Sequence, residues 1–272
     1  LREFCVYVNM GIREQHTIGF AHGISCSDPT ARIVINSFDA FTYRWFDQIN
    51  AAVQGGSHFT IIADTAGLTN AQNGRTHQST GQPGAVLAMP GISFLEPWDA
   101  EDTFRCFNWA VGESRGIVYL RIHSSVVQVS PMPGVKRTLT SYVAWESTQV
   151  ELTITIVASG FPVSSAIQAG QQLEREGIGV RVVNLVDHKR SDEVLRQLLL
   201  PGKLLLTVYN GNTDVLLQNV ARIICTGDLT RAPCRVAGMG FEEGATGTFD
   251  QLRRVYALDA DGVVARVRNL LS

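Results

Sequence analysis

The sequence predicts an α/β protein built from two doubly wound, mainly parallel sheets. Three observations predict this class: short β-rich runs alternate with longer helical patterns, most of the runs are apolar throughout, and a stretch in the middle of the chain has no clear period. Strands that are apolar on both sides are typical of a parallel sheet covered by helices on both faces. With 272 residues, 45% of them hydrophobic and 18% charged, the chain is long enough for two domains.

The first domain is expected over residues 1–130. Its predicted strands are, in chain order, Phe4–Val8, Arg32–Ile35, Phe59–Ala63, Ile92–Leu95 and Ile117–Ile122. Its predicted helices are Arg13–Ser25, Ala40–Val53 and Asp99–Gly112. Strand–helix–strand alternation of this kind favours right-handed crossovers and a parallel sheet. Because the first residue is Leu1 and leads at once into strand-like sequence, we expect that residues are missing upstream.

A linker is predicted over residues 131–149, where Pro131, Pro133 and Gly134 interrupt the pattern. The second domain is expected over residues 150–272. Its predicted strands are Leu152–Ala158, Val180–Leu185, Leu204–Tyr209 and Arg235–Gly238. Its predicted helices are Val163–Glu176, Asp192–Leu200, Asp214–Thr226 and Leu258–Leu271, the last capped by Asp259.

Charge and cysteine usage narrow the function classes. The 23 basic and 25 acidic residues leave a net charge of −2, which disfavours a nucleic-acid partner or a membrane partner. The cysteine count of 5 is odd, and no Cys-x-x-Cys pair occurs, so neither a disulfide framework nor a zinc site is expected. No pairing of His with Glu has metal-ligand spacing. A reduced cytoplasmic setting is the expectation.

The first candidate cluster is Gly11–His16, which follows a predicted strand and opens a helix. Glu14 has two interpretations. A carboxylate in a first helical turn is favoured by the macrodipole, so it is consistent with an ordinary helix start. It is also well placed to meet a ligand at the carboxyl edge of a sheet.

The second cluster, Ser37–Gln48, likewise follows a strand and enters a helix. Phe38, Phe41 and Trp45 stand at helical spacing, which usually indicates a core stripe. The functional alternative is an aromatic platform for a flat heterocycle.

The third cluster joins Asp64–Leu68 to Asn73–Gln78 in a Gly- and Asn-rich loop after a strand. A lone histidine is commonly structural or superficial. In a loop at the carboxyl end of a parallel strand, His77 is also a candidate for polar catalysis.

Taken in order, these clusters resemble the C-terminal half of a transketolase, and the resemblance covers nearly the whole chain. Gly11–Glu14 is similar to the family's G-[IV]-R-E, and Asp64–Gln78 is similar to D-S-I-G followed by G-P-T-H-Q. Pro90–Glu101 resembles P-G-[LM] followed by R-P-[AC]-D-A-x-E, and Val118–Arg121 resembles the strand that closes the first domain. In the second domain, Ala158–Val163 is similar to A-[ST]-G-S-E-V.

The resemblance implies a thiamine-diphosphate pyrimidine-binding domain followed by a transketolase C-terminal domain. It implies thiamine diphosphate as cofactor, with Mg²⁺ or Ca²⁺ held on a diphosphate-binding N-terminal subunit. This chain would then be one subunit of a split enzyme, a transferase active only with its partner in an α2β2 heterotetramer. The reaction implied is the transfer of a two-carbon ketol unit between small molecules.

The resemblance also implies roles for particular residues. Glu14 matches the glutamate that contacts the aminopyrimidine and promotes loss of the cofactor's C2 proton. Phe41 matches the position that stacks on that ring, and Phe38 lies beside it. Arg44 stands where transketolases commonly have Tyr and deoxyxylulose-phosphate synthases have Arg. His77 matches the histidine that contacts substrate oxygens and moves protons.

Departures from the pattern fall on the substrate side. Asn73 stands in place of an Asp that contacts a donor hydroxyl, and Arg75 replaces the Pro of G-P-T-H-Q. Ala63 replaces a His, and Ser124 falls near a family Arg that is expected to hold substrate phosphate. These changes predict a non-standard, unphosphorylated acceptor in a specialised biosynthetic pathway, with Arg44 and Arg75 as new sources of charge.

Two alternatives stay open beside the ketol transferase. One is a beta-like subunit of a 2-oxo acid decarboxylase or dehydrogenase, or of an acyloin-forming enzyme, in which pyruvate replaces the ketose as donor. The other is a non-catalytic structural partner that keeps a relic site. A nicotinamide-binding domain is disfavoured because no phosphate loop is present.

Overall fold

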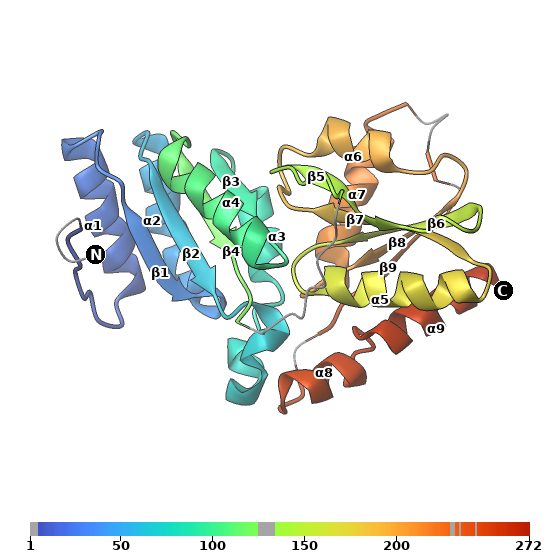
Figure 1. Cartoon of the computed structure of the whole chain (residues 1–272). Coiled ribbons are helices and arrows are strands. Elements are labelled where there is room, and N and C mark those ends of the chain that lie inside the picture. Colours follow the sequence, from blue (N-terminus) through green and yellow to red (C-terminus); the bar gives the residue numbers. More distant parts are fainter. Residues whose placement is uncertain (1–4, 125–133, 229–231, 234, 243) are drawn as a thin grey trace.

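The computed structural model describes residues 5–124, 134–228, 232–233, 235–242 and 244–272. They form two α/β units side by side, the N-terminal unit at one end of Figure 1 and the C-terminal unit at the other. Each unit has a central sheet with helices on both faces. The predicted fold class is therefore confirmed.

The first sheet has four parallel strands in the order β1-β2-β4-β3. The strands are β1 (Val34–Phe38), β2 (Phe59–Asp64), β3 (Ile92–Leu95) and β4 (Ile117–Arg121). The α-helices are α1 (Glu14–Ser27), α2 (Phe46–Gln54), α3 (Gln82–Ala88) and α4 (Ala100–Gly112). The short 3₁₀ segments are η1 (Asp39–Trp45), η2 (Gly67–Asn73) and η3 (Arg75–His77).

The strand β4 is buried on both faces of the first sheet, which explains its apolar run Ile117–Leu120. Ile117 and Tyr119 of β4 point into the core that contains residues of α1, α2 and α3. Val118 and Leu120 alternate with them and point into the core on the α4 side. Successive side chains of β4 thus point to opposite faces, and because both faces are covered, both sets are apolar, as is typical of a parallel strand.

The second sheet has five strands in the order β5-β7-β6-β8-β9, all parallel except β5. The strands are β5 (Ser141–Glu146), β6 (Leu152–Ala158), β7 (Gly179–Leu185), β8 (Leu204–Val208) and β9 (Arg235–Met239). The helices are α5 (Pro162–Arg175), α6 (Asp192–Leu198), α7 (Thr213–Cys225), α8 (Phe249–Val255) and α9 (Ala260–Leu271). Residues of α5 and α9 share one core, and residues of α6 and α7 share the core on the other face.

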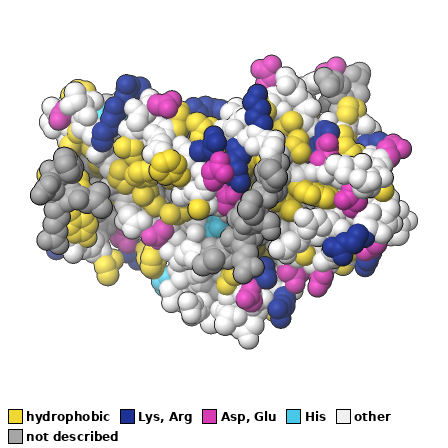
Figure 2. Space-filling view, in the orientation of Figure 1, with side chains coloured by type: hydrophobic (Ala, Val, Ile, Leu, Met, Phe, Trp, Pro, Cys, Tyr) yellow, Lys and Arg dark blue, Asp and Glu magenta, His cyan; other side chains and the backbone are white. Residues whose placement is uncertain are grey.

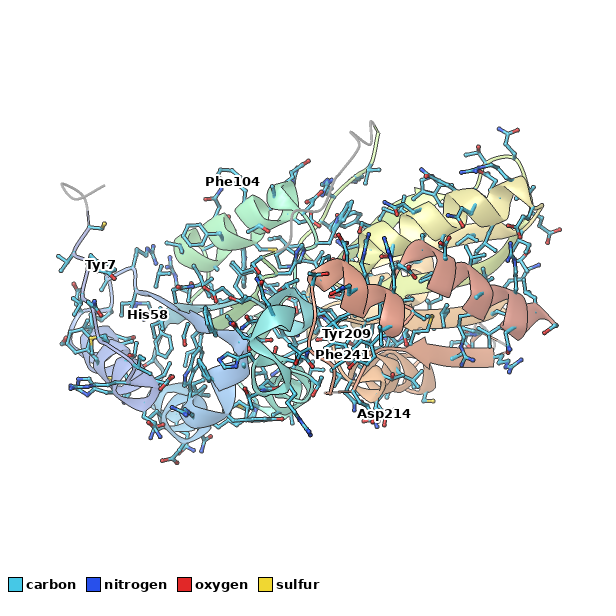
Figure 3. All side chains as sticks on the ribbon, turned by 90° about the horizontal axis from the view of Figure 1, so that it is seen from below. Tyr7, His58, Phe104, Tyr209, Asp214 and Phe241 are labelled. Atoms are coloured by element: carbon cyan, nitrogen blue, oxygen red, sulfur yellow. The ribbon has the colours of Figure 1, made fainter. Side chains whose placement is uncertain are left out.

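The two units share one hydrophobic core. The cluster that holds Val118 and Leu120 of β4 continues through Phe161 and the inner face of α5 to Val263 of α9. Figure 3 shows Tyr209 and Phe241 at this junction. The backbones also join, since Glu96 N–H donates to Val186 C=O over 2.8 Å and His188 N–H donates to Phe94 C=O over 3.0 Å. The units are thus fused by both apolar packing and a strand-like seam.

Three details differ from the sequence prediction. The predicted strand Phe4–Val8 is wrong over its described residues, because Cys5–Val8 form no strand and Val6 is 92% exposed, with no neighbouring strand to pair. The predicted helix Ala40–Val53 is a 3₁₀ turn followed by α2. The range predicted as a linker, 131–149, contains β5, which pairs antiparallel with β7; the division at residues 130 and 150 stays a prediction.

The helix predicted at the C-terminus is confirmed as α9, and the Asp259 carboxylate accepts from Gly262 N–H over 3.0 Å. No helix in the described part of the chain combines the length and the apolar character that crossing a membrane would need.

Candidate active site

The candidate residues meet at the carboxyl edge of the first sheet. β1 ends at Phe38 and continues directly into η1, which carries Phe41 and Arg44. β2 ends at Asp64 and leads into the loop that carries His77. Because β1 and β2 are adjacent and parallel, both loops leave the sheet at the same edge.

Glu14 is the first residue of α1 and only 7% exposed, although its helix start has no side-chain cap from Arg13. Its carboxylate lies 3.5 Å from the Arg44 guanidinium, whose side chain is 58% exposed. The carbon of that guanidinium lies 5.5 Å from the centre of the Phe41 ring. Glu14 is therefore a nearly buried carboxylate that is connected through Arg44 to an aromatic ring. An acid that only favours a helix start would have neither the burial nor these contacts.

Phe38, Phe41 and His77 form a continuous ring cluster. The Phe38 and Phe41 centroids are 6.0 Å apart with planes inclined by 20°, so the two rings are stacked. The His77 ring meets Phe41 edge-on at 5.4 Å and Phe38 at 6.5 Å. Thr76 Oγ1 lies 2.9 Å from His77 Nδ1, which leaves Nε2 as the ring nitrogen for other contacts.

Phe38, Phe41 and Trp45, which stand at helical spacing in the sequence, lie in two different environments. Trp45 is 1% exposed and belongs to the core, as the packing interpretation expects. Phe38 is 37% exposed, and Phe41 is partly exposed outside that core. The two phenylalanines are therefore available to a flat ligand, as the platform interpretation expects.

Asn73 is the last residue of η2 and Arg75 is the first residue of η3, and both are exposed. The Asn73 amide donates to Asn70 Oδ1 over 2.6 Å, and Asn70 is itself buried. The structure thus brings five predicted residues into one cluster by direct contact, namely Glu14, Phe38, Phe41, Arg44 and His77. It places Asn73 and Arg75 on the exposed loop that leads to His77.

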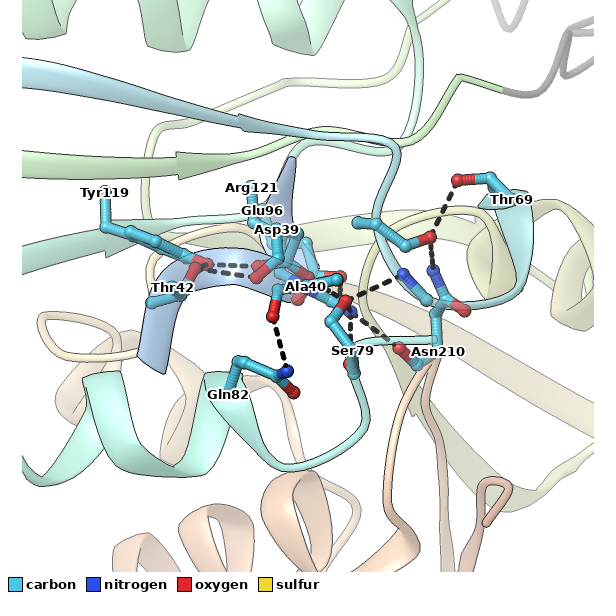
Figure 4. Close-up of polar contacts among 12 residues, drawn as sticks. Asp39, Ala40, Thr42, Thr69, Ser79, Gln82, Glu96, Tyr119, Arg121 and Asn210 are labelled. Atoms are coloured by element: carbon cyan, nitrogen blue, oxygen red, sulfur yellow. Dashed lines mark hydrogen bonds and ion pairs between the residues drawn. The ribbon is translucent and has the colours of Figure 1, made fainter. Parts of the chain in front are cut away.

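A buried charge network under the site was not predicted. Arg121, at the end of β4, is 0% exposed and pairs with Asp39 at 2.7 Å and with Glu96. Figure 4 shows these three side chains beside Tyr119 and Ser79. The only sequence signal was a lone Arg at the end of an otherwise apolar strand.

The protonation of this network follows from its contacts. Burial by itself would raise the pKa of Glu96, but the Arg121 charge and the neighbouring His188 ring hold that pKa below its usual range. Burial and the nearby Asp39 carboxylate raise the pKa of Tyr119, so its hydroxyl stays protonated and donates to Asp39. The network therefore pairs one guanidinium with two carboxylates, one of which, Asp39, is the first residue of η1.

Within the described residues, no group of three or more His, Cys, Asp or Glu side chains is placed to hold a metal ion.

Models of two protein families match the chain. A transketolase pyrimidine-binding domain matches residues 3–129, and a transketolase C-terminal domain matches residues 144–263.

Several relatives are similar over nearly the whole chain. A protein from Methanocaldococcus jannaschii described as a transketolase C-terminal section is 25% identical over 96% of this chain and 81% of its own length. A 6-deoxy-6-sulfo-D-fructose transketolase subunit from Clostridium is 27% identical over 94% of this chain and 79% of its length. A 1-deoxy-D-xylulose-5-phosphate synthase from Clostridium tetani is 24% identical over 97% of this chain but only 42% of its length.

Solved structures agree with the family match. A split-gene transketolase described as an inactive beta4 tetramer is 25% identical, with a TM-score of 0.77 over 96% of this chain and 82% of that chain. Transketolase from Campylobacter jejuni, at 17% identity, has the same fold with a TM-score of 0.82 over 96% of this chain and 39% of its own. This chain belongs to the transketolase family and carries its pyrimidine-binding and C-terminal domains.

Proposed function

We propose that this chain is the C-terminal subunit of a two-component, thiamine-diphosphate-dependent enzyme that transfers a two-carbon ketol unit. One observation carries the proposal: a nearly buried Glu14 is connected through Arg44 to the stacked Phe38–Phe41 pair, against which His77 packs. These residues come from three separate segments that converge on one edge of the sheet.

The residues present suit an aminopyrimidine ring. Phe41, with Phe38 stacked beside it, offers an apolar face, and Glu14 offers a carboxylate shielded from water. A shielded carboxylate hydrogen-bonds a ring nitrogen more strongly than an exposed one, because the local dielectric is low. We assign Glu14, Phe38, Phe41 and Arg44 to binding the pyrimidine half of thiamine diphosphate, which when bound supplies the electrophilic ring for carbanion chemistry.

His77 is the proposed proton carrier of this chain. Its ring is held by edge contacts to Phe41 and Phe38, and its Nδ1 is beside the Thr76 hydroxyl. An oriented imidazole of this kind can hold or move a proton at a substrate oxygen near neutral pH. Asn73 and Arg75 are proposed to contact the substrate from the exposed loop.

The partner is proposed to be an N-terminal transketolase subunit in the cytoplasm, assembled with this chain as an α2β2 heterotetramer and holding the diphosphate with Mg²⁺ or Ca²⁺. The two split relatives that cover most of this chain support this assignment. So do exposed apolar side chains in the segment that leads into Glu14, since Tyr7 is 84% exposed and Ile12 is 88% exposed. Exposed apolar side chains beside a binding site commonly mark an interface.

The substrate is proposed to be non-standard, in a specialised biosynthetic pathway. Ser124, near the position of a family Arg, is an exposed serine whose N–H lies 3.4 Å from Thr69 Oγ1. Ala63 is buried within β2 and offers no polar group. An unphosphorylated acceptor is consistent with both positions.

A pyruvate-type donor is the second candidate. Arg44 stands where deoxyxylulose-phosphate synthases have Arg, and such a synthase is 24% identical to this chain over 97% of it. An arginine next to the proposed cofactor site is suited to a donor carboxylate.

The test is reconstitution with the product of the neighbouring gene for the other half. Calorimetry should show tight thiamine diphosphate binding to the complex and little to this chain alone. Turnover is then measured with ketose donors and with pyruvate. Glu14→Ala should abolish turnover and leave assembly intact, whereas Glu193→Ala, a first-turn acid of α6, should change neither.

Three results would contradict parts of this proposal. Unchanged turnover in Glu14→Ala would favour a non-catalytic structural partner. Faster turnover of pyruvate than of any ketose would favour the second candidate. Efficient turnover of xylulose 5-phosphate with ribose 5-phosphate would remove the argument for a non-standard acceptor.

A further inference from the structure

The second domain has the kind of crevice in which open α/β sheets bind ligands. Its first parallel strand, β6, lies between β7 and β8, so the chain changes direction at the β6–β8 pair. The loops that leave the carboxyl ends of β6 and β8 are Ser159–Phe161 and Tyr209–Asn212. Ligands of doubly wound folds bind outside the strand ends at such a switch point.

Side chains of the first domain fill this crevice. Gly160 has a φ of +65°, and a Cβ placed on it would lie 2.9 Å from Glu96 Oε1. His188 Nε2 lies 3.3 Å from Glu96 Oε2, and the Tyr209 ring centre is 5.5 Å from the Arg121 guanidinium carbon. The second domain therefore receives the Arg121–Glu96 pair where a free ligand would otherwise bind.

Asn210 extends this contact to the active-site loop. Its side chain is fully buried; its Oδ1 accepts from Leu68 N–H and its Nδ2 donates to Ala66 C=O, both over 3.0 Å. Between these two groups lies Gly67, with a φ of +59°, and a Cβ there would overlap the Asn210 amide. The Asn210 side-chain amide thus makes two hydrogen bonds to the backbone at the start of the loop after β2.

The far end of the same loop is also held by the second domain. Gln78 Nε2 donates to Ala245 C=O over 2.6 Å, and Asn212 N–H donates to Thr80 C=O over 3.2 Å. Ser79 ties the two ends together, since its hydroxyl accepts from Gly67 N–H over 3.1 Å and donates to Asp39. Figure 4 shows Asn210 and Ser79 on the two sides of this junction.

The geometry points to Asn210 as a positioning residue for the active site. We propose that the second domain, through the Asn210 amide, fixes the loop of residues 66–80 and thereby the placement of His77 against Phe41. The catalytic consequence rests on the proposed function of His77, but the fixing of the loop does not.

The first test needs no activity. Trypsin can cut the exposed loop after Arg75, and mass spectrometry follows that one cleavage in the intact chain. Asn210→Ala removes both hydrogen bonds and should speed cleavage about 25-fold, since each bond lost favours the open loop by a factor of roughly five. The control is Asn219→Ala, a buried second-domain Asn whose amide donates to His188 C=O away from the loop.

A second variant keeps the test decisive if Asn210→Ala does not fold. Asn210→Asp keeps the size and the acceptor for Leu68 N–H but faces Ala66 C=O with a second acceptor in place of the donor, so its cleavage rate should also exceed that of Asn219→Ala. Cleavage at Arg75 in the Asn210 variants no faster than in Asn219→Ala would overturn the proposal.

Kinetics of the reconstituted complex then test the role in catalysis. Asn210→Ala should lower kcat about tenfold and leave thiamine diphosphate affinity unchanged, because Glu14, Phe38 and Phe41 lie outside the loop. An equal loss of kcat and of thiamine diphosphate affinity would indicate general destabilisation and refute a positioning role. If wild type turns over no donor, the proposed function fails, while the proteolysis result still decides whether Asn210 holds the loop.

Discussion

Replacing Arg121 by Met should destabilise the protein strongly, in a way that depends on pH. Arg121 is 0% exposed and pairs with Asp39 at 2.7 Å and with Glu96, which is 2% exposed. Met fills much of the same volume but leaves two buried carboxylates without a counter-charge. Removing one partner of a buried ion pair typically costs about 3–5 kcal/mol, so we expect a loss of that size at pH 7.

The pH dependence has a definite sign. In the wild type the pKa of Glu96 is held below its ordinary value of 4.5, so this pairing stabilises the fold above that pH and is lost as the pH falls through the lowered pKa. In Arg121→Met the Glu96 carboxylate loses its counter-charge, so its burial raises the pKa of Glu96. Protonation of Glu96 at lower pH then removes the unpaired buried charge. The difference in unfolding free energy between variant and wild type should therefore shrink as the pH falls from 7 toward 5.

Urea unfolding measures both effects. Trp45 and Trp98 are each 1% exposed, one in each of the cores that flank the first sheet, so tryptophan fluorescence reports loss of the fold. The control is Arg268→Met, which breaks a surface pair with Glu176 and should change the unfolding midpoint little. A loss below about 1 kcal/mol for Arg121→Met at pH 7, or a loss that grows on acidification, would refute the assigned roles.

Three further predictions concern the site and its support. Phe41→Ala should weaken thiamine diphosphate binding to the reconstituted complex about tenfold by calorimetry, whereas Phe104→Ala, 67% exposed on α4, should leave it unchanged. His77→Ala should lower kcat by roughly 10²–10⁴ in steady-state assays while cofactor affinity persists; a smaller effect would remove it as proton carrier. Gly160→Ala should cost about 1–3 kcal/mol in urea unfolding, more than Gly177→Ala, because both have positive φ but only Gly160 faces Glu96.

The α4 surface used for the Phe104 control is itself apolar. Figure 2 shows hydrophobic side chains gathered over this part of the first domain. A groove of about 530 Å³ lies there, lined by Phe104, Phe107, Ile62 and Ile122 among others. It lies on the sheet face opposite α1, α2 and α3, so Phe104→Ala perturbs an exposed aromatic remote from the proposed cofactor site.

Local sequence was enough for most of the elements, although not for α3, β5 and α8, and the resemblance to transketolases singled out the candidate residues. Strand ends and helix starts are set by short-range patterns. Phe38 ends β1 and Phe41 lies in the turn that follows, so their shared edge could be predicted. The same reasoning failed at Cys5–Val8, whose apolar pattern has no partner strand among the described residues. A strand exists only where another strand pairs with it, and a local pattern does not contain that information.

The buried network could not be predicted for a related reason. Arg121 meets Asp39 across 82 positions of sequence and Asn210 across 89. In a linear reading Asp39 resembles any first-turn acid and Asn210 any loop residue. Packing within the first domain brings Asp39 to the Arg121 guanidinium, and packing of the second domain against the first brings the Asn210 carbonyl to it.

The shared core has a consequence for how the protein loses its structure. Apolar residues of β4, α5 and α9 belong to one continuous cluster, and two main-chain hydrogen bonds cross the seam between β3 and the segment after β7. Cutting the chain between the halves would expose that cluster on both fragments. We therefore expect a single cooperative melting transition, and fragments that aggregate when expressed separately.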